Sequence, residues 1–234
     1  MRIIIFSDVH ANLEALAALH QVEKPPDALF FLGDMVGYGP DPAACVGWTR
    51  AYATHVVRGD HDDATATGAE FGSPPELRDL AIATREHTLR QLNARDLAYL
   101  AKLPTTIQVE LSGTKFFLAH GSPREPSTRL FDFATMSENA LRAELEGVDA
   151  DVILLGHTHV PAIRKVGDKY LVNPGSLGQP RHGLPSATFA VWEDGSLRIH
   201  HIDYDPKPTM NKISLMPLDP EIAERLKEIL EKGL

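Results

Sequence analysis

The residues "RIIIFSDVH" (2–10) place a run of β-branched and aromatic side chains directly before an aspartate and a histidine. A short apolar run of this kind is typical of a buried strand. The same form returns in "DALFFLG" (27–33) and "HVVRG" (55–59), and sequences typical of helices lie between these runs at 13–23 and 41–53. This alternation of strands and helices predicts parallel strands and an α/β fold.

The second half of the chain is richer in strand-like sequence, and its expected strands cover 106–111, 115–121, 151–159, 170–176, 187–194 and 197–205. Residues 64–104 interrupt the strands with helical sequence. The expected helices there and further along the chain lie near 76–93, 95–102, 137–146 and 219–232. No linker separates the two halves, so we predict a single domain over residues 1–234 that contains two sheets.

The composition narrows the classes of partner. The chain has 234 residues with 23 Lys and Arg against 32 Asp and Glu, a net charge of −9. An acidic protein of this kind binds nucleic acid and anionic membranes poorly. Its one cysteine, Cys45, excludes a disulfide framework or a cysteine zinc site within one chain, which fits a cytoplasmic protein. No segment reaches the ~18 consecutive apolar residues of a membrane span, so we expect no membrane partner.

Five stretches share one form, an apolar run followed by residues that bind metals. They are "IIIFSDVH", "LFFLGDMVGYGP", "HVVRGDHDD", "KFFLAHG" and "DVILLGHTH". Open α/β sheets build their sites at the carboxyl ends of strands, where these residues fall. Carboxylates and imidazoles without cysteine suit Mn, Fe, Ni, Co or Zn. In Asp8–His10 and His157–His159 the spacing of two residues would place both side chains on one side of an extended chain.

The ordered array resembles the calcineurin-like metallophosphoesterase superfamily, whose pattern is D-x-H, G-D, G-N-H-[D/E], H and G-H-x-H. The stretch "NPGSLGQPR" (173–181) is similar to the small prokaryotic phosphoesterase branch of that superfamily. The resemblance implies a calcineurin-like four-layer sandwich of the α/β (α+β) class, with two packed mixed β-sheets flanked by helices. Because the helical segment 64–104 interrupts the alternation of strands, we expect it either to flank the active site or to consist of packing helices alone.

The resemblance further implies two divalent transition-metal ions that share a water or hydroxide, with Mn as the ion that we expect to support activity. It assigns three ligands to each ion and one bridging carboxylate. The first group is Asp8, His10 and His159. The second group is Asp60, His120 and His157, and the bridge is Asp34.

The residue after a metal ligand is the candidate for acid catalysis. His61 follows Asp60 and is not a ligand in the family pattern, so we expect it to protonate the leaving group, with Asp62 holding its orientation. Tyr38, Arg58 and Arg181 are candidates for contacts with the substrate, since each lies near a motif or in a Gly/Pro-rich loop.

The predicted function is metal-dependent hydrolysis of small phosphomonoesters or phosphodiesters, with nucleotides among the candidate substrates. The alternatives are a catalytically weak binding or scaffold protein on the same fold, and a nuclease, which the acidic composition disfavours. Two departures from the family bear on this prediction. Asp60 stands where the family pattern has Asn, and Gly37-Tyr38-Gly39 replaces the Asp-Arg-Gly of the Ser/Thr protein phosphatases, which argues against that activity. The sequence leaves the oligomeric state open.

Overall fold

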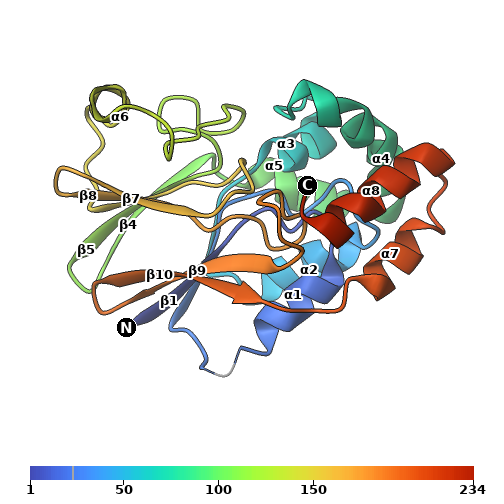
Figure 1. Ribbon diagram of the computed structural model, residues 1–234, viewed down its shortest axis with the longest axis horizontal. Coiled ribbons are helices and arrows are strands. Elements are labelled where there is room, and N and C mark those ends of the chain that lie inside the picture. The colour runs from blue at the N-terminus through green and yellow to red at the C-terminus, as the bar shows by residue number, and fades with distance from the viewer. Residues whose placement is uncertain (23) are drawn as a thin grey trace.

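Two five-stranded sheets lie one above the other in the computed structural model of the protein, which describes residues 1–22 and 24–234 (Figure 1). The first sheet has the order β10-β9-β1-β2-β3 and the second the order β4-β5-β6-β8-β7. Their strands are β1 (Arg2–Phe6), β2 (Ala28–Phe31), β3 (His55–Val56), β4 (Thr106–Leu111), β5 (Thr114–Ala119), β6 (Val152–Leu154), β7 (Ala162–Val166), β8 (Lys169–Asn173), β9 (Ala187–Glu193) and β10 (Ser196–Ile202).

Both sheets are mixed, and three strands of each run parallel. In the first sheet β1 pairs with β2 and β2 with β3 in parallel, so that Ile5 lies opposite Phe30, while β9 runs antiparallel to β1. In the second sheet β5, β6 and β8 are parallel, and β4 and β7 pair antiparallel at its edges. The carboxyl ends of the parallel strands therefore meet at one end of each sheet.

The alternation of side chains along β1 explains the layers. Ile3 and Ile5 enter a cluster between the two sheets that includes Phe116, while Ile4 and Phe6 enter a cluster with the helices that cover the first sheet. Successive side chains of a strand point to opposite faces, so a strand with helices on one face and a second sheet on the other is apolar throughout. This arrangement is the four-layer sandwich expected from the sequence.

The helices flank the sheets. They are α1 (Leu13–His20), α2 (Pro42–Tyr52), α3 (Asp60–Thr67), α4 (Arg78–Gln91), α5 (Ala94–Lys102), α6 (Glu138–Glu144), α7 (Lys207–Ile213) and α8 (Pro220–Lys232), with a 3₁₀ turn at Pro75–Leu77. Helices α1, α2 and α5 contribute to the cluster on the first sheet, and α6 packs on the outer face of the second. In Figure 1, α4, α7 and α8 lie together on the right, and α8 contacts both of the others.

Several elements differ from those expected. The charged residues after β3 form a helix, α3, and not a turn; its sequence "DHDDATAT" has no apolar face, so periodicity could not reveal it. Three carboxylates in its first turn suit the positive end of the helix dipole. Strand β7 and helix α7 were not expected, and the helix expected over 13–23 ends at His20. Residue 23 itself lies outside the described residues.

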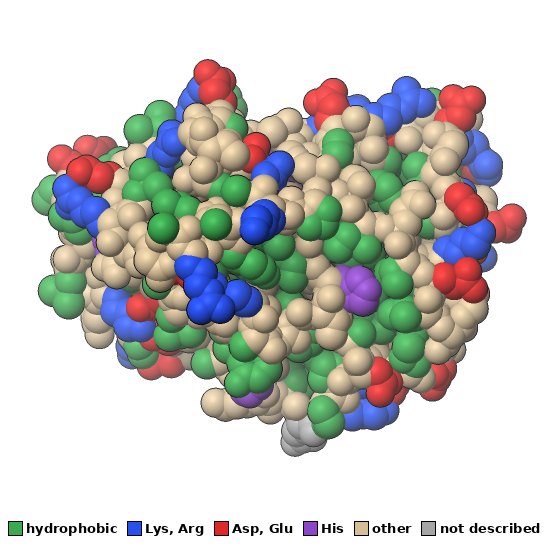
Figure 2. Space-filling view, turned by 180° about the vertical axis from the view of Figure 1, so that it is seen from behind, with side chains coloured by type: hydrophobic (Ala, Val, Ile, Leu, Met, Phe, Trp, Pro, Cys, Tyr) green, Lys and Arg blue, Asp and Glu red, His purple; other side chains and the backbone are tan. Residues whose placement is uncertain are grey.

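The surface agrees with the acidic composition. On the face drawn in Figure 2, which is the back of the view in Figure 1, acidic side chains gather along the edges, and basic side chains lie singly or in small groups. No helix within residues 1–22 and 24–234 is long and apolar enough to cross a membrane. The single domain over residues 1–234 stays a prediction.

Candidate metal centre

Seven predicted ligands converge where the parallel strands end. Asp8, Asp34 and Asp60 follow β1, β2 and β3, and His120 and His157 follow β5 and β6. Backbone hydrogen bonds continue beyond the strands, since the Asp8 N–H donates to the Gly33 carbonyl oxygen at 3.0 Å and the Gly156 N–H donates to that of His120 at 2.8 Å. All seven side chains are at most 4% exposed.

The ligands form two groups that share one carboxylate. In one group His159 Nε2 lies 3.1 Å from Asp8 Oδ1, and His10 Nε2 lies 3.7 Å from the same oxygen. In the other, Asp60 Oδ1 lies 3.2 Å from both His120 Nε2 and His157 Nδ1. Asp34 Oδ2 lies 3.3 Å from His120 Nε2 and 3.7 Å from His10 Nε2, so it reaches both groups.

Each of the four imidazoles is oriented by a backbone carbonyl. The ring nitrogens and their partners are His10 Nδ1 with Val36 O (3.1 Å), His120 Nδ1 with Leu32 O (2.7 Å), His157 Nε2 with Thr128 O (3.2 Å) and His159 Nδ1 with Gln179 O (2.6 Å). A carbonyl oxygen only accepts hydrogen bonds, so the ring nitrogen facing it carries the proton. In a neutral ring the other nitrogen then presents a lone pair, and in all four rings that nitrogen faces the carboxylates.

This arrangement fits cations between the groups. His10 Nε2 and His159 Nε2 are 3.1 Å apart, as are His120 Nε2 and His157 Nδ1, so the nitrogens turned away from the backbone carbonyls meet in each pair. The buried oxygens Asp8 Oδ1 and Asp60 Oδ1 have no hydrogen-bond partner. Burial lowers the pKa of His120, but the carboxylates around it, Asp34 foremost, outweigh burial and raise that pKa well above its usual range. The carboxylates of the cluster therefore favour positive charge at its centre. A histidine that binds a metal usually donates its other ring N–H to a carbonyl or carboxylate oxygen, as each of these rings does to a backbone carbonyl.

The backbone at the site is unusual. Five of the seven candidate ligands, Asp8, His10, Asp34, His157 and His159, have φ between 46° and 69°, in the left-handed region. The expectation that Asp8–His10 and His157–His159 lie on extended chain was therefore wrong. Their side chains converge because the backbone turns sharply at each residue. Such strained positions cluster at functional sites.

Glycine is needed at positions 59 and 156, because the backbone there passes very close to neighbouring loops. A Cβ atom on Gly59 would lie 2.0 Å from Asp34 Oδ1 and 2.4 Å from the Asp34 backbone nitrogen. On Gly156 it would lie 2.2 Å from Ser7 Oγ. The glycine before each ligand therefore lets neighbouring loops come close enough for the carboxylates to meet.

His61 lies at the edge of the cluster. Its backbone N–H donates to Asp34 Oδ1 at 2.9 Å, and its ring packs edge-on against that of His10, with centroids 4.9 Å apart. Its Nε2 lies 2.9 Å from Ser73 Oγ, and its Nδ1 has no hydrogen-bond partner. Burial lowers the pKa of His61 to about 4. The ring is thus neutral at pH 7 in this state.

Asp62 supports the ligand loops. Its carboxylate is fully buried and accepts hydrogen bonds from the backbone N–H groups of Asp34 (2.9 Å), Met35 (3.0 Å) and Gly59 (3.2 Å). Burial raises the pKa of Asp62 to about 6, and the Gly59 donor opposes that effect most strongly. These contacts hold the residues around Asp34, and the ring of His61 has another partner in Ser73, so the role of Asp62 in orienting His61 stays a prediction.

The three predicted substrate contacts do not lie together in the structure. Arg181 and Tyr38 lie together near the cluster, with the guanidinium carbon 5.8 Å from the ring centroid. Arg58 is engaged elsewhere, because it donates to the Ala101 carbonyl oxygen at 2.9 Å and faces Asp63 at 3.4 Å. We therefore leave Arg58 out of the candidate site.

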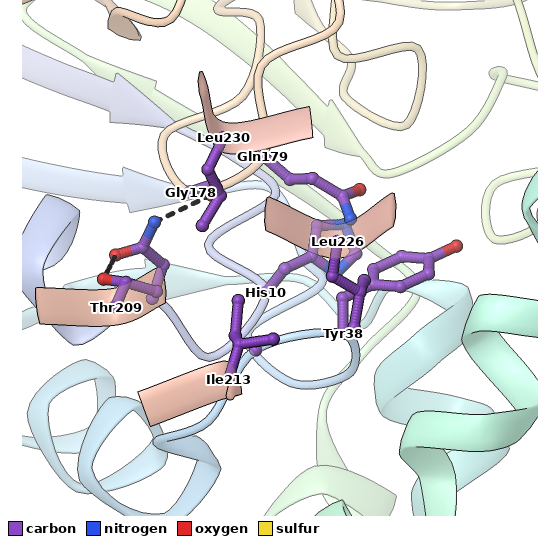
Figure 3. Close-up of a pocket in the computed structure, with 10 residues that line it drawn as sticks. His10, Tyr38, Gly178, Gln179, Thr209, Ile213, Leu226 and Leu230 are labelled. Atoms are coloured by element: carbon purple, nitrogen blue, oxygen red, sulfur yellow. Dashed lines mark hydrogen bonds between the residues drawn. The ribbon is translucent and has the colours of Figure 1, made fainter. Parts of the chain in front are cut away.

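A small cavity lies beside His10. Figure 3 shows His10 and Tyr38 beneath Leu226, with Leu230 above Gly178; the leucines come from α8. The cavity has a volume of about 10 Å³, which is room for about one water molecule. Helix α8 thus closes this side of the cluster.

The segment 68–74 also contacts the site, and the sequence did not single it out. Gly72 N–H donates to Asp60 Oδ2 at 2.7 Å, and Ser73 Oγ lies 3.0 Å from Tyr38 Oη as well as beside His61. The only signal in the sequence was the run "FGSPP" (71–75), which is typical of any loop.

Comparison with known proteins shows the family of the chain. Residues 1–194 match the model of the calcineurin-like phosphoesterase superfamily domain. The crystal structure of a metallophosphoesterase from Sphaerobacter thermophilus is similar, with a TM-score of 0.81 and 30% identity over 100% of this chain and 99% of that one. The uncharacterized protein MJ0912 of Methanocaldococcus jannaschii is 29% identical over 243 residues, 96% of each chain. Phosphodiesterase YfcE of Escherichia coli K12 is 24% identical over 189 residues, 80% of this chain and 85% of its own. The similarity to the Sphaerobacter structure confirms the predicted four-layer fold.

Proposed function

Because the chain belongs to the calcineurin-like phosphoesterase superfamily, we propose that it hydrolyses small phosphomonoesters or phosphodiesters at the cluster of strand ends. Membership makes the chain a hydrolase that acts on ester bonds, and it confirms the superfamily and the small prokaryotic branch predicted from the sequence. The observation that carries the proposal is the orientation of the four imidazoles, each bonded to a backbone carbonyl through one nitrogen and turned toward buried carboxylates with the other.

The proposed metal ligands follow the two groups. Asp8, His10 and His159 would hold one divalent ion, Asp60, His120 and His157 would hold the other, and Asp34 would contact both. Imidazole and carboxylate donors suit Mn, Fe, Ni, Co or Zn, and we expect Mn to support activity. Two such ions, when bound, polarise the phosphoryl group and make water more acidic.

His61 is the proposed general acid. Its backbone N–H donates a hydrogen bond to Asp34. Its ring Nε2 lies beside the hydroxyl of Ser73, which belongs to neither ligand group. Burial keeps the ring neutral at pH 7, but an anionic phosphate beside it would raise its pKa and protonate it. The proton would then pass from His61 Nε2 to the leaving-group oxygen.

Arg181 and Tyr38 are the proposed contacts with the substrate phosphate and its leaving group. A guanidinium offers paired N–H donors to phosphate oxygens, and the neighbouring phenol offers a hydroxyl and an apolar ring. The scattered basic groups on the face in Figure 2 form no continuous stripe among the described residues drawn there, which favours a small substrate over a nucleic acid.

The experiment is an assay of an aryl phosphodiester and an aryl phosphomonoester after chelation, with and without added Mn²⁺. We expect turnover of at least one substrate that depends on Mn²⁺. Asp34→Asn serves as the control for contaminating phosphatases, because the substitution weakens the one carboxylate that reaches both groups. A panel of phosphorylated metabolites then identifies the class of substrate.

Two results would count against the proposal. If the purified protein turns over neither aryl substrate nor any member of the panel with Mn²⁺, the binding-protein alternative is preferred. If Asp34→Asn retains full activity, the turnover does not come from this cluster.

A further inference from the structure

Residues 68–74 lie between the metal centre and solvent. The segment joins α3 to the 3₁₀ turn and has no helix or strand of its own. It begins at Gly68, which ends α3 with φ of 85°. A Cβ atom on Gly72 would lie 2.8 Å from the Thr128 carbonyl oxygen and 3.2 Å from His157 Nε2, so the backbone passes close over the second ligand group. The phenyl ring of Phe71 lies 4.9 Å from the ring of His61.

The hydroxyl of Ser73 takes the place that a substrate needs. It lies 2.9 Å from His61 Nε2, the atom proposed to protonate the leaving group. A general acid must come within about 2.6–3.2 Å of the oxygen that it protonates. Ser73 Oγ is within that distance already, so the leaving-group oxygen and the serine hydroxyl cannot both occupy it.

A second contact, between Gly72 and Asp60, holds the segment and explains why residue 60 is acidic. One oxygen of Asp60 faces His120 and His157, and the other accepts the hydrogen bond from Gly72 N–H. An asparagine has one acceptor oxygen, and its amide nitrogen only donates. With its oxygen turned to the ligand group, an Asn would present N–H donors to the Gly72 N–H. A carboxylate satisfies both sides.

Little of the candidate ligands is exposed in this state. His61 is 2% exposed and the ligands are at most 4% exposed, while α8 closes the opposite side to about 10 Å³ beside His10. Residues 71–74 are themselves partly exposed, and their polar anchors are on Asp60, His61 and Tyr38. Movement of this segment uncovers the site without disturbing the sheets.

We propose that residues 68–74 are a gate that competes with the substrate, in which Ser73 holds the position of the leaving-group oxygen and Gly72 latches on the second oxygen of Asp60. The proposal rests on the proposed function, because the competition is for the atom that would protonate the substrate. A phosphoester that enters must displace the serine. Only the molecules with an open gate can bind the substrate, so the apparent affinity is lower than the affinity of the open form.

The first test is hydrogen exchange of the Gly72 amide in the Mn²⁺-loaded protein, with inorganic phosphate as the probe. Phosphate should speed exchange, because it displaces the segment. Ser73→Ala should speed it by roughly five- to thirtyfold without phosphate, the factor for one or two lost hydrogen bonds. Glu70→Ala is the matched control, since the Glu70 side chain is 89% exposed and pairs with Arg78 outside the site. Exchange that phosphate slows or leaves unchanged overturns the gate, as does wild-type exchange in Ser73→Ala.

The second test is kinetic. Ser73→Ala should lower KM by up to the same factor and leave kcat within about twofold, because it removes a competitor and no group of the reaction. A fall in kcat with unchanged KM would make Ser73 part of the reaction and overturn the proposal. The exchange measurement needs no turnover, so failure of the proposed hydrolysis and failure of the gate are told apart.

Discussion

The backbone at Gly59 approaches Asp34 very closely, and adding one methyl group there should destabilise the protein and weaken metal binding together. In Gly59→Ala the new Cβ would lie 2.0 Å from Asp34 Oδ1 and 2.4 Å from the Asp34 nitrogen. Carbon and oxygen atoms normally stay about 3.5 Å or more apart at their optimal contact, so Asp34 or residue 59 must shift by roughly 1 Å or more.

Neither Asp34 nor residue 59 can move easily. The Asp34 N–H is bonded to Asp62, and the Asp34 carboxylate is bonded to the backbone of His61. Overpacking of a buried site lowers the free energy of unfolding by about 1–3 kcal/mol. Because hydrogen bonds are also lost here, we expect a decrease of about 3 kcal/mol. For a chain of this length that corresponds to a fall in Tm of roughly 6–12 °C. Because Asp34 reaches both ligand groups, we expect affinity for Mn²⁺ to fall by about 10–100-fold.

The chain provides a matched control. Gly47 lies within α2, and a Cβ atom there would meet nothing within 4 Å. Gly47→Ala should therefore stabilise the protein by about 0.5–1 kcal/mol, since alanine favours the helix over glycine. The assays are thermal denaturation in chelator and calorimetric titration with Mn²⁺. If Gly59→Ala melts within about 1 °C of the wild type and binds Mn²⁺ as tightly, the close approach at Asp34 does not hold the site.

Three further predictions concern the ligands and the acid. Protein loaded with Mn²⁺ and freed of excess ion should hold about two ions per chain by elemental analysis, because seven donors exceed what one ion needs; a stoichiometry of one or none would contradict the two groups. His61→Ala should keep its metal but lose about 10²–10⁴-fold in kcat, and the loss should shrink for substrates with good leaving groups, so equal losses for good and poor leaving groups would exclude the acid role. Asp60→Asn should weaken one Mn²⁺ site by about tenfold in a two-site titration and speed exchange of the Gly72 amide; two unchanged sites would mean that the carboxylate does not act on the metal.

The sequence predicted the parts of the fold that depend on apolar periodicity. The run Arg2–Phe6 is buried on both faces, as its composition required, and the tail helix at Pro220–Lys232 buries Leu226, Ile229 and Leu230 as the spacing indicated. The convergence of the candidate ligands could also be expected, because strand ends are where such sheets build sites and the residues there have metal-binding side chains. Periodicity says nothing of α3, whose sequence has no apolar face.

The supporting contacts of the site could not be predicted. In the sequence, Asp62 and Asp63 are two similar carboxylates in one charged run, yet Asp62 is fully buried on three backbone amides and Asp63 faces Arg58. What distinguishes them is the approach of the loop after β2, a tertiary contact between residues 27 or more positions apart. The contacts of Ser73 have the same origin, since its partners come from the loop after β2 and from α3.

The metal centre is a place where the metal-free fold carries strain that its scaffold must offset. Five candidate ligands hold left-handed backbone, and burial together with the neighbouring charge of Asp60 raises the pKa of Asp34 well above its usual range. Residues in unfavourable backbone conformations persist only where their surroundings over-determine them. Here the surroundings are the strands just before the ligands, where Ile5, Phe30 and Leu118 are fully buried between the two sheets and fix the strand ends. Any cation that binds the folded cluster and not the unfolded chain adds stability through mass action, in proportion to the logarithm of its concentration over its Kd. The sheets therefore hold the candidate ligands in place without metal, and a bound cation would relieve the repulsion among their carboxylates.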